Sequence, residues 1–91
     1  MSNAIVIAMD TGRQLFALED AETGFCAVFD YLSGPSLSAG DVVAGDVCAR
    51  MMCNFEHDRG TCIAHARTSP LSRLKAVVLV DGPPTSYGPL Q

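Results

Sequence analysis

The sequence contains no tryptophan and only one lysine, and aromatic residues make up 7% of its 91 positions. Its longest uninterrupted apolar run, residues 4–9, has six residues and no basic residue before it. Such a run is too short to span a membrane and lacks the flanks of a secretion signal. We therefore expect a soluble cytoplasmic protein that does not associate with membranes.

The sequence also lacks a close cysteine pair of the C-x2-C type. Residue types that zinc prefers do occur, in the spacing C-x4-C-x3-H-x4-C-x2-H, at Cys48, Cys53, His57, Cys62 and His65. Structural zinc sites usually bring their ligands in closer pairs. Free cysteine is among the most buried residue types and behaves as a small apolar residue. We therefore expect the cysteines to pack in the core as thiols, without a metal.

No catalytic motif or phosphate-binding loop is present either. The candidate acid or base groups are Asp30, Asp41, Asp46 and His57, but no spacing selects them over ordinary surface and turn positions. We expect no catalytic residues and no cofactor, so the sequence does not predict an enzyme.

What the sequence does contain is a pattern of short strands and turns. Residues 40–47 place a Gly-Asp turn before a β-branched run that a second glycine, Gly45, interrupts, as in a strand bent around a small barrel. We predict strands over residues 4–10, 14–20, 25–32, 51–57 and 61–67, with another beginning at Asp41. The first two strands are apolar on both faces, which indicates that both faces are buried. Leu37 is expected to pack onto the barrel end.

The last two of these strands are predicted to form a hairpin around Asp58-Arg59-Gly60, since glycine allows the positive φ of a tight turn. The facing pairs are then His57 with Gly60, Phe55 with Cys62, and Cys53 with Ala64. One face carries Met51, Cys53, Phe55, Cys62, Ala64 and Ala66, and the other carries Met52, Asn54, Glu56, Ile63, His65 and Arg67. We expect the first face to point into the core.

Toward the end of the chain, residues 69–74 favour a helical turn, with Ser69 as the N-cap and Pro70 at the first helical position. Residues 75–80 are β-branched and are predicted to form a strand. Prolines and glycines follow, so we expect a flexible tail over residues 82–91. The remainder, residues 1–81, is predicted to be a single domain.

Three stretches carry a family resemblance: residues 15–20 (LFALED), residues 24–32, and residues 37–43 (LSAGDVV) before the closing hairpin. Over residues 4–66 their order resembles the oligonucleotide/oligosaccharide-binding (OB) fold, and most nearly its cold-shock branch. The expected fold class is therefore all-β, a small antiparallel barrel of five to six strands.

The resemblance implies binding of single-stranded nucleic acid by aromatic side chains of the second and third strands, with lysines in support. The matching positions of the second strand hold Leu15 and Ala17, while the third strand keeps Phe29 and has Val28 in place of a histidine. Each stacking aromatic contributes about 1–3 kcal/mol, so this loss disfavours the role. Nucleic-acid binding remains the alternative function, through Phe16, Phe25, Phe29, Tyr31 and Arg13, with Arg50 and Arg67 in support.

The formal net charge of −4 conceals an uneven distribution. Residues 1–46 hold seven acidic and one basic residue, and residues 47–91 hold three acidic and five basic residues. Acidic charge repels phosphates, which further favours a protein partner. The function we expect is a non-catalytic interaction module, with candidate contacts Tyr31, Arg50, Glu56, His65, Arg67 and Arg73. An open strand edge would also allow a homodimer.

Overall fold

The structure of the protein is a computed structural model that describes residues 3–48, 51–68 and 70–82. Its strands are β1 (Asn3–Asp10), β2 (Leu15–Asp20), β3 (Cys26–Ser33), β4 (Val42–Ala44), β5 (Met52–His57) and β6 (Gly60–Ala66), and its helix is α1 (Arg73–Asp81). The part of the tail that follows Gly82 lies outside the described residues. No helix in the described part of the chain has the length and apolar character needed to cross a membrane.

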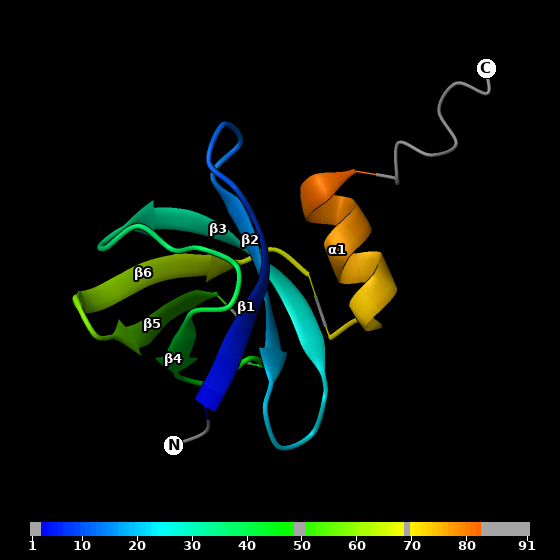
Figure 1. Cartoon of the computed structure of the whole chain (residues 1–91), viewed down its shortest axis with the longest axis horizontal. Helices are drawn as coiled ribbons and strands as arrows, with labels where there is room; N and C mark the ends of the chain where they lie inside the picture. The colour runs from blue at the N-terminus through cyan, green and yellow to red at the C-terminus, as the bar shows by residue number, and fades with distance from the viewer. Residues whose placement is uncertain (1–2, 49–50, 69, 83–91) are drawn as a thin grey trace.

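The six strands form a closed antiparallel barrel in the order β1-β2-β3-β6-β5-β4 (Figure 1). This confirms the predicted all-β barrel, and the arrangement is compatible with an OB-like barrel. Closure depends on the short strand β4, which pairs with β1 over three positions and with β5 only where Ala44 faces Glu56. The seam between β4 and β5 is therefore the least extensively paired part of the barrel.

Three phenylalanines fill the barrel interior. Phe16 and Phe29 stack with ring centroids 5.6 Å apart, and Phe55 meets both rings edge-on, at 6.3 and 5.0 Å. Leu37 is buried against this cluster, as predicted. Gly45 follows β4 directly, and a Cβ atom there would lie 2.4 Å from Cδ1 of Phe55. Gly45 is therefore needed for close packing on the core as the chain bends away from β4.

The β5–β6 hairpin has the predicted register, with His57 facing Gly60, Phe55 facing Cys62 and Cys53 facing Ala64. The inward side chains Cys53, Phe55, Cys62 and Ala64 are all buried. Met51 is the exception, since it lies before β5 with a φ of 70° and its side chain is exposed. The prediction that Met51 points into the core is therefore wrong.

The helix α1 corrects the strand predicted over residues 75–80. A short helix was expected nearby, but it begins at Arg73, with Ser72 as the N-cap accepting from the Lys75 backbone N–H at 3.3 Å. Ser69, the N-cap predicted from sequence, lies outside the described residues. Packing of Ala76 and Val80 on the sheet outweighs the weak helix propensity of valine.

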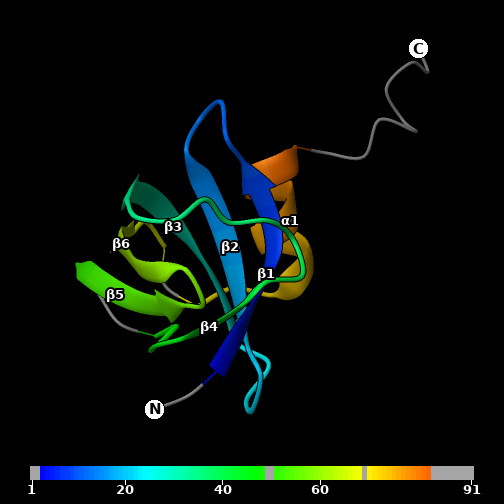
Figure 2. The ribbon, with the colours of Figure 1, turned by 60° about the vertical axis from the view of Figure 1, so that its left-hand side comes forward.

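The helix instead covers the outer faces of β1, β2 and β3 (Figures 1 and 2). A second core lies in this contact, where Ala76 and Val80, one helical turn apart, are buried against the sheet. The sheet contributes Ala8, Leu15, Ala17, Cys26 and Val28. The two-sided burial predicted for the first two strands is thus explained by a barrel core on one face and a helix on the other.

Candidate interaction surface

The helix does not cover the outer faces of β6 and β5, nor that of β3 from Asp30 onward. Asp30 on β3 faces His65 on β6, and His65 faces Met52 on β5, so these three side chains form one row across the sheet. The row lies in a hollow of about 440 Å³, which we call the outer hollow. Its lining residues are Arg13, Gln14, Asp30, Tyr31, Leu32, Met52 and His65.

Large apolar side chains surround the outer hollow. Leu32 is 50% exposed, Met52 58%, and the neighbouring Met51 72%. Tyr31 packs partly against the barrel core and donates its hydroxyl hydrogen to the Gly34 carbonyl. The positive φ of Met51 costs on the order of 1 kcal/mol or more for a bulky residue. The chain therefore presents a methionine to solvent in a backbone conformation that local preference opposes.

Charges border the outer hollow in compensated pairs. The Asp30 carboxylate lies 3.2 Å from Nη1 of Arg67 and 3.8 Å from Nδ1 of His65. Both pairs are about half exposed, so each contributes little to stability. The rim is consequently polar but close to neutral.

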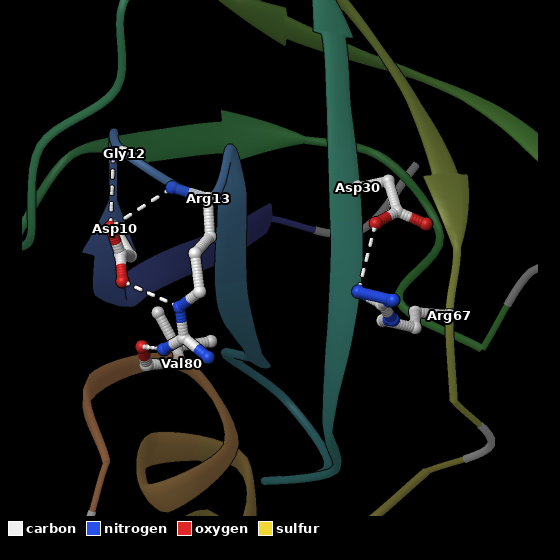
Figure 3. Close-up of polar contacts among 6 residues, drawn as sticks. All are labelled: Asp10, Gly12, Arg13, Asp30, Arg67 and Val80. Atoms are coloured by element: carbon white, nitrogen blue, oxygen red, sulfur yellow. Dashed lines mark hydrogen bonds and ion pairs between the residues drawn. The ribbon is translucent and has the colours of Figure 1, made fainter.

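Arg13 has a structural role at the other edge of this region (Figure 3). Its Nε lies 2.8 Å from Oδ2 of Asp10, and its Nη2 donates to the Val80 carbonyl in the last turn of α1. This guanidinium holds the pKa of the Asp10 carboxyl below its ordinary value. Since a helix C-terminus favours a cation, Arg13 joins the β1–β2 turn to the helix and supplies a charge that the last turn lacks.

The uneven charge distribution of the sequence is largely removed by folding. Basic residues of the second half pair with acidic residues of the first: Arg59 with Asp41 at 4.0 Å, Arg67 with Asp30 at 3.2 Å, and Arg73 with Glu19 at 2.5 Å. Arg13 lies beside Asp10, so every arginine in the described ranges has a neighbouring carboxylate.

A second hollow, of about 710 Å³, lies beside the β5–β6 turn and the start of β4. Here His57 Nε2 lies 3.1 Å from Oδ2 of Asp41, and the Arg59 backbone N–H donates to His57 Nδ1 at 3.1 Å. Because Nδ1 accepts this bond, the geometry fits a neutral ring with its proton on Nε2. The Asp41 pKa is lowered, mainly by the Ser38 backbone N–H and then by His57.

This Asp41–His57 pair unites two of the acid or base candidates considered from sequence. The His57 side chain is only 8% exposed, and both ring nitrogens already have partners. Asp30 pairs with Arg67 on another face, and Asp46 accepts the Cys48 backbone N–H at 2.9 Å. The Asp41–His57 pair therefore holds the loop before β4 against the β5–β6 turn. The four acid or base candidates do not form one cluster.

Cys53 and Cys62 take the places that the hairpin register predicted for them, whereas Cys48 is exposed, which corrects the expectation that it packs in the core. Cys53 and Cys62 are buried in the barrel core, whereas His65 is exposed on the opposite face. Burial raises the pKa of the Cys53 thiol and raises that of Cys62 to about 11. Burial likewise raises the pKa of Cys26, beneath the helix. No group of three or more potential metal ligands occurs within residues 3–48, 51–68 and 70–82.

The predicted protein-contact residues are only partly brought together. Tyr31 and His65 line the outer hollow. Arg67 lies at its border, because it pairs with Asp30, which is one of the lining residues. Glu56 lies on the second hollow and accepts from the Thr61 hydroxyl at 2.9 Å, while Arg73 binds Glu19 near the helix. Arg50 lies outside the described residues.

The predicted nucleic-acid face is not assembled. Phe16 and Phe29 are fully buried, which corrects the expectation that their rings are accessible to bases. Phe25 is exposed but lies beside the start of α1, and Arg13 is engaged by Asp10 and Val80.

Sequence reasoning did not select Leu32 and Met52 as contact residues. Met52 was assigned correctly to the outer face of the hairpin, and an apolar side chain at an outward position was the signal for its inclusion. Leu32 follows the partly buried Tyr31, and a register shift between Tyr31 and Ser33 changes the alternation there. Alternation with Val28 and Asp30 nevertheless predicts an outward position for Leu32, and this was the available signal.

Comparisons of the chain with family models, curated proteins and solved structures give no match. The structure supports a closed six-stranded antiparallel barrel, but neither a family nor a cold-shock assignment is supported.

Proposed function

We propose that this chain is a non-catalytic interaction module that binds another protein through the outer hollow. The observation that carries the proposal is the exposure of Leu32 and Met52 in a hollow that Tyr31 and His65 also line, with exposed Met51 next to Met52 in the chain. Single exposed apolar residues are ordinary on protein surfaces, but a contiguous apolar patch with a polar rim is typical of a contact site. The partner would insert an apolar side chain into the hollow.

The residue types around the hollow support this use. Tyrosine and arginine are enriched at the centres of protein interfaces, and methionine adapts its unbranched side chain to different surfaces. The rim pair of Asp30 and Arg67 can bind polar groups of either sign on the partner, since the Arg67 side chain is 53% exposed and that of Asp30 35%. Affinity would thus come from the apolar centre, and orientation from the rim.

The other functions considered receive less support. A nucleic-acid face would need exposed aromatic rings beside cations that are free to bind phosphate. Phe16 and Phe29 are buried, and the described arginines lie beside carboxylates. The Asp41–His57 pair is the most enzyme-like arrangement, but its hydrogen bonds fasten a loop.

The proposal is tested by affinity capture with the full chain as bait, followed by quantitative mass spectrometry. The test variant is Leu32→Asp with Met52→Asp, and the matched control is Val42→Asp, which alters an exposed apolar residue on another face. We expect a defined set of proteins to bind wild type and control equally and to bind the test variant at least about tenfold less. Circular dichroism checks that all three baits are folded.

Equal capture by the wild type and the double variant would overturn the proposal. A titration with a mixed single-stranded oligonucleotide, followed by amide NMR at two salt concentrations, covers the alternative. Salt-sensitive shifts over residues 14–31 would favour nucleic-acid binding instead.

A further inference from the structure

The helix α1 presents large apolar side chains, together with Lys75, on the side that points away from the barrel. Its inner face is buried through Ala76 and Val80. On the solvent side Leu74 is 70% exposed and Val78, one turn further on, is half-buried, while Leu79, 47% exposed, lies at the flank of the helix beside Leu15 and Val28. A helix that covers a domain normally carries polar side chains on its solvent face. The outer face of α1 therefore resembles a surface that a second element covers.

The charged residues of α1 lie at the ends opposite to those that the helix dipole favours. Arg73 and Lys75 lie in the first turn, where the dipole is positive and no acidic residue is present. Asp81 is the last helical residue, where the dipole is negative. Arg73 is paired with Glu19, but within the described residues neither Lys75 nor Asp81 has an ion-pair partner.

We infer that the outer face of α1 binds the same face of a second copy of this chain, with the two helices antiparallel. In that arrangement, with Lys75 of each copy beside Asp81 of the other, Val78 lies opposite its counterpart and Leu74 packs beside the last turn of the other helix. The basic first turn of each helix lies at the same end as Asp81 of the other, so the unfavourable charges become complementary. A two-fold axis satisfies both ends at once, because each helix supplies the same patch.

The surroundings of α1 fit this arrangement. A hollow of about 530 Å³ lies at the start of the helix, lined by Gly24, Phe25, Pro70, Leu71, Ser72 and Lys75. The last turn of the second helix would lie next to this hollow, where exposed Phe25 extends the apolar surface.

The predicted dimer is weak. A nine-residue helix is roughly 14 Å long, so a pair of such helices buries less than the roughly 1,200 Å² of a typical stable interface. We expect a dissociation constant on the order of 10–100 μM and rapid exchange with monomer. This self-association is independent of the outer hollow, which lies on the outer faces of β6, β5 and the end of β3.

Sedimentation equilibrium of the full chain over a wide concentration range tests the inference. The wild type should approach twice the chain mass near 1 mM, and Leu74→Gln with Leu79→Gln should weaken association at least about tenfold. Leu32→Asp on the outer hollow is the matched control and should associate like the wild type. A wild type that stays monomeric throughout, or a dimer that Leu32→Asp abolishes, would overturn the inference.

A charge swap tests the antiparallel orientation. Lys75→Glu alone and Asp81→Lys alone place like charges at each end of the pair, so each should weaken association roughly tenfold over the two symmetric contacts. The double variant should associate as well as the wild type. An equimolar mixture of the two single variants should form a heterodimer, because each then carries the charges that the other lacks. Failure of both combinations to restore association would exclude this orientation.

Discussion

The barrel has two halves that differ in what covers their outer faces. Strands β1, β2 and β3 carry α1 on the outside, and in β2 every residue but Glu19 is buried. In β5 the pattern alternates strictly, with Cys53 and Phe55 buried and their neighbours exposed or half-buried. The first half is thus a layer between two cores, and the second half is the wall of a single core.

This difference separates structural positions from positions that can serve binding. Outward side chains on the covered half, such as Val28 and Leu15, are part of the second core, so their replacement disturbs folding. Outward side chains on the uncovered half, such as Met52 and His65, meet solvent and can change with little structural consequence. Only the uncovered half is free to present a contact surface on its strands.

The largest predicted effect contrasts one apolar position from each environment. Val80→Asp places a carboxylate between α1 and the sheet and should lower the free energy of unfolding by at least about 3 kcal/mol. Met52→Asp places the same group on the exposed face and should change it by less than about 0.5 kcal/mol. Urea unfolding followed by circular dichroism measures both.

Hydrogen exchange identifies what is lost in the first variant. Amides of α1 should lose protection before those of β5 and β6, because the barrel core does not depend on Val80. Equal destabilisation by the two substitutions would contradict the division of the barrel into covered and uncovered halves.

Much of this division could be predicted from sequence. The alternation in residues 51–57 and 61–67 predicted the hairpin register and its buried cysteines. The absence of alternation in Leu15-Phe16-Ala17-Leu18 predicted burial on both faces. The helix was missed because its valines favour a strand when taken alone. The requirement that some segment cover the outer face of the first strands was the available signal.

The candidate site was less predictable for a different reason. Tyr31 and His65 were identified, but the outer hollow also needs Arg13, Gln14 and Leu32, which reach it from a turn and from an irregular strand end. The arginines were assigned to binding because their carboxylate partners are distant in sequence, as with Arg67 and Asp30. Such pairs follow from tertiary packing, which strand periodicity does not reveal.

Two arginines sharpen the comparison at the level of single contacts. Arg13→Ala removes the contact to the end of α1 and should cost about 1–2 kcal/mol of stability. Arg67→Ala removes an exposed pair and should cost less than about 0.5 kcal/mol. Thermal and urea unfolding give both values. Arg13→Lys is the control, since it keeps the charge without the bidentate fork and should fall between wild type and Arg13→Ala.

The smallest predicted effect concerns the contacts of Asp41, which hold the loop before β4 against the β5–β6 turn. The Asp41 carboxylate accepts from the Ser38 backbone N–H at 3.0 Å and lies near His57 and Arg59, and these contacts lower its pKa. A lowered folded pKa means that this stabilisation is complete above the unfolded pKa of about 3.9 and is lost as pH falls through the lower folded value. The melting temperature of the wild type should therefore decline more steeply below pH 4 than that of Asp41→Asn, whose amide does not titrate.

Asp10→Asn, at the edge of the covered half, should also make the melting temperature less dependent on pH in acid, because Arg13 lowers the pKa of Asp10 in the same way. If Asp41→Asn and the wild type follow the same acid curve, the loop before β4 is held by packing of Leu37 on the core, and the carboxylate contacts contribute nothing to the closure of the barrel.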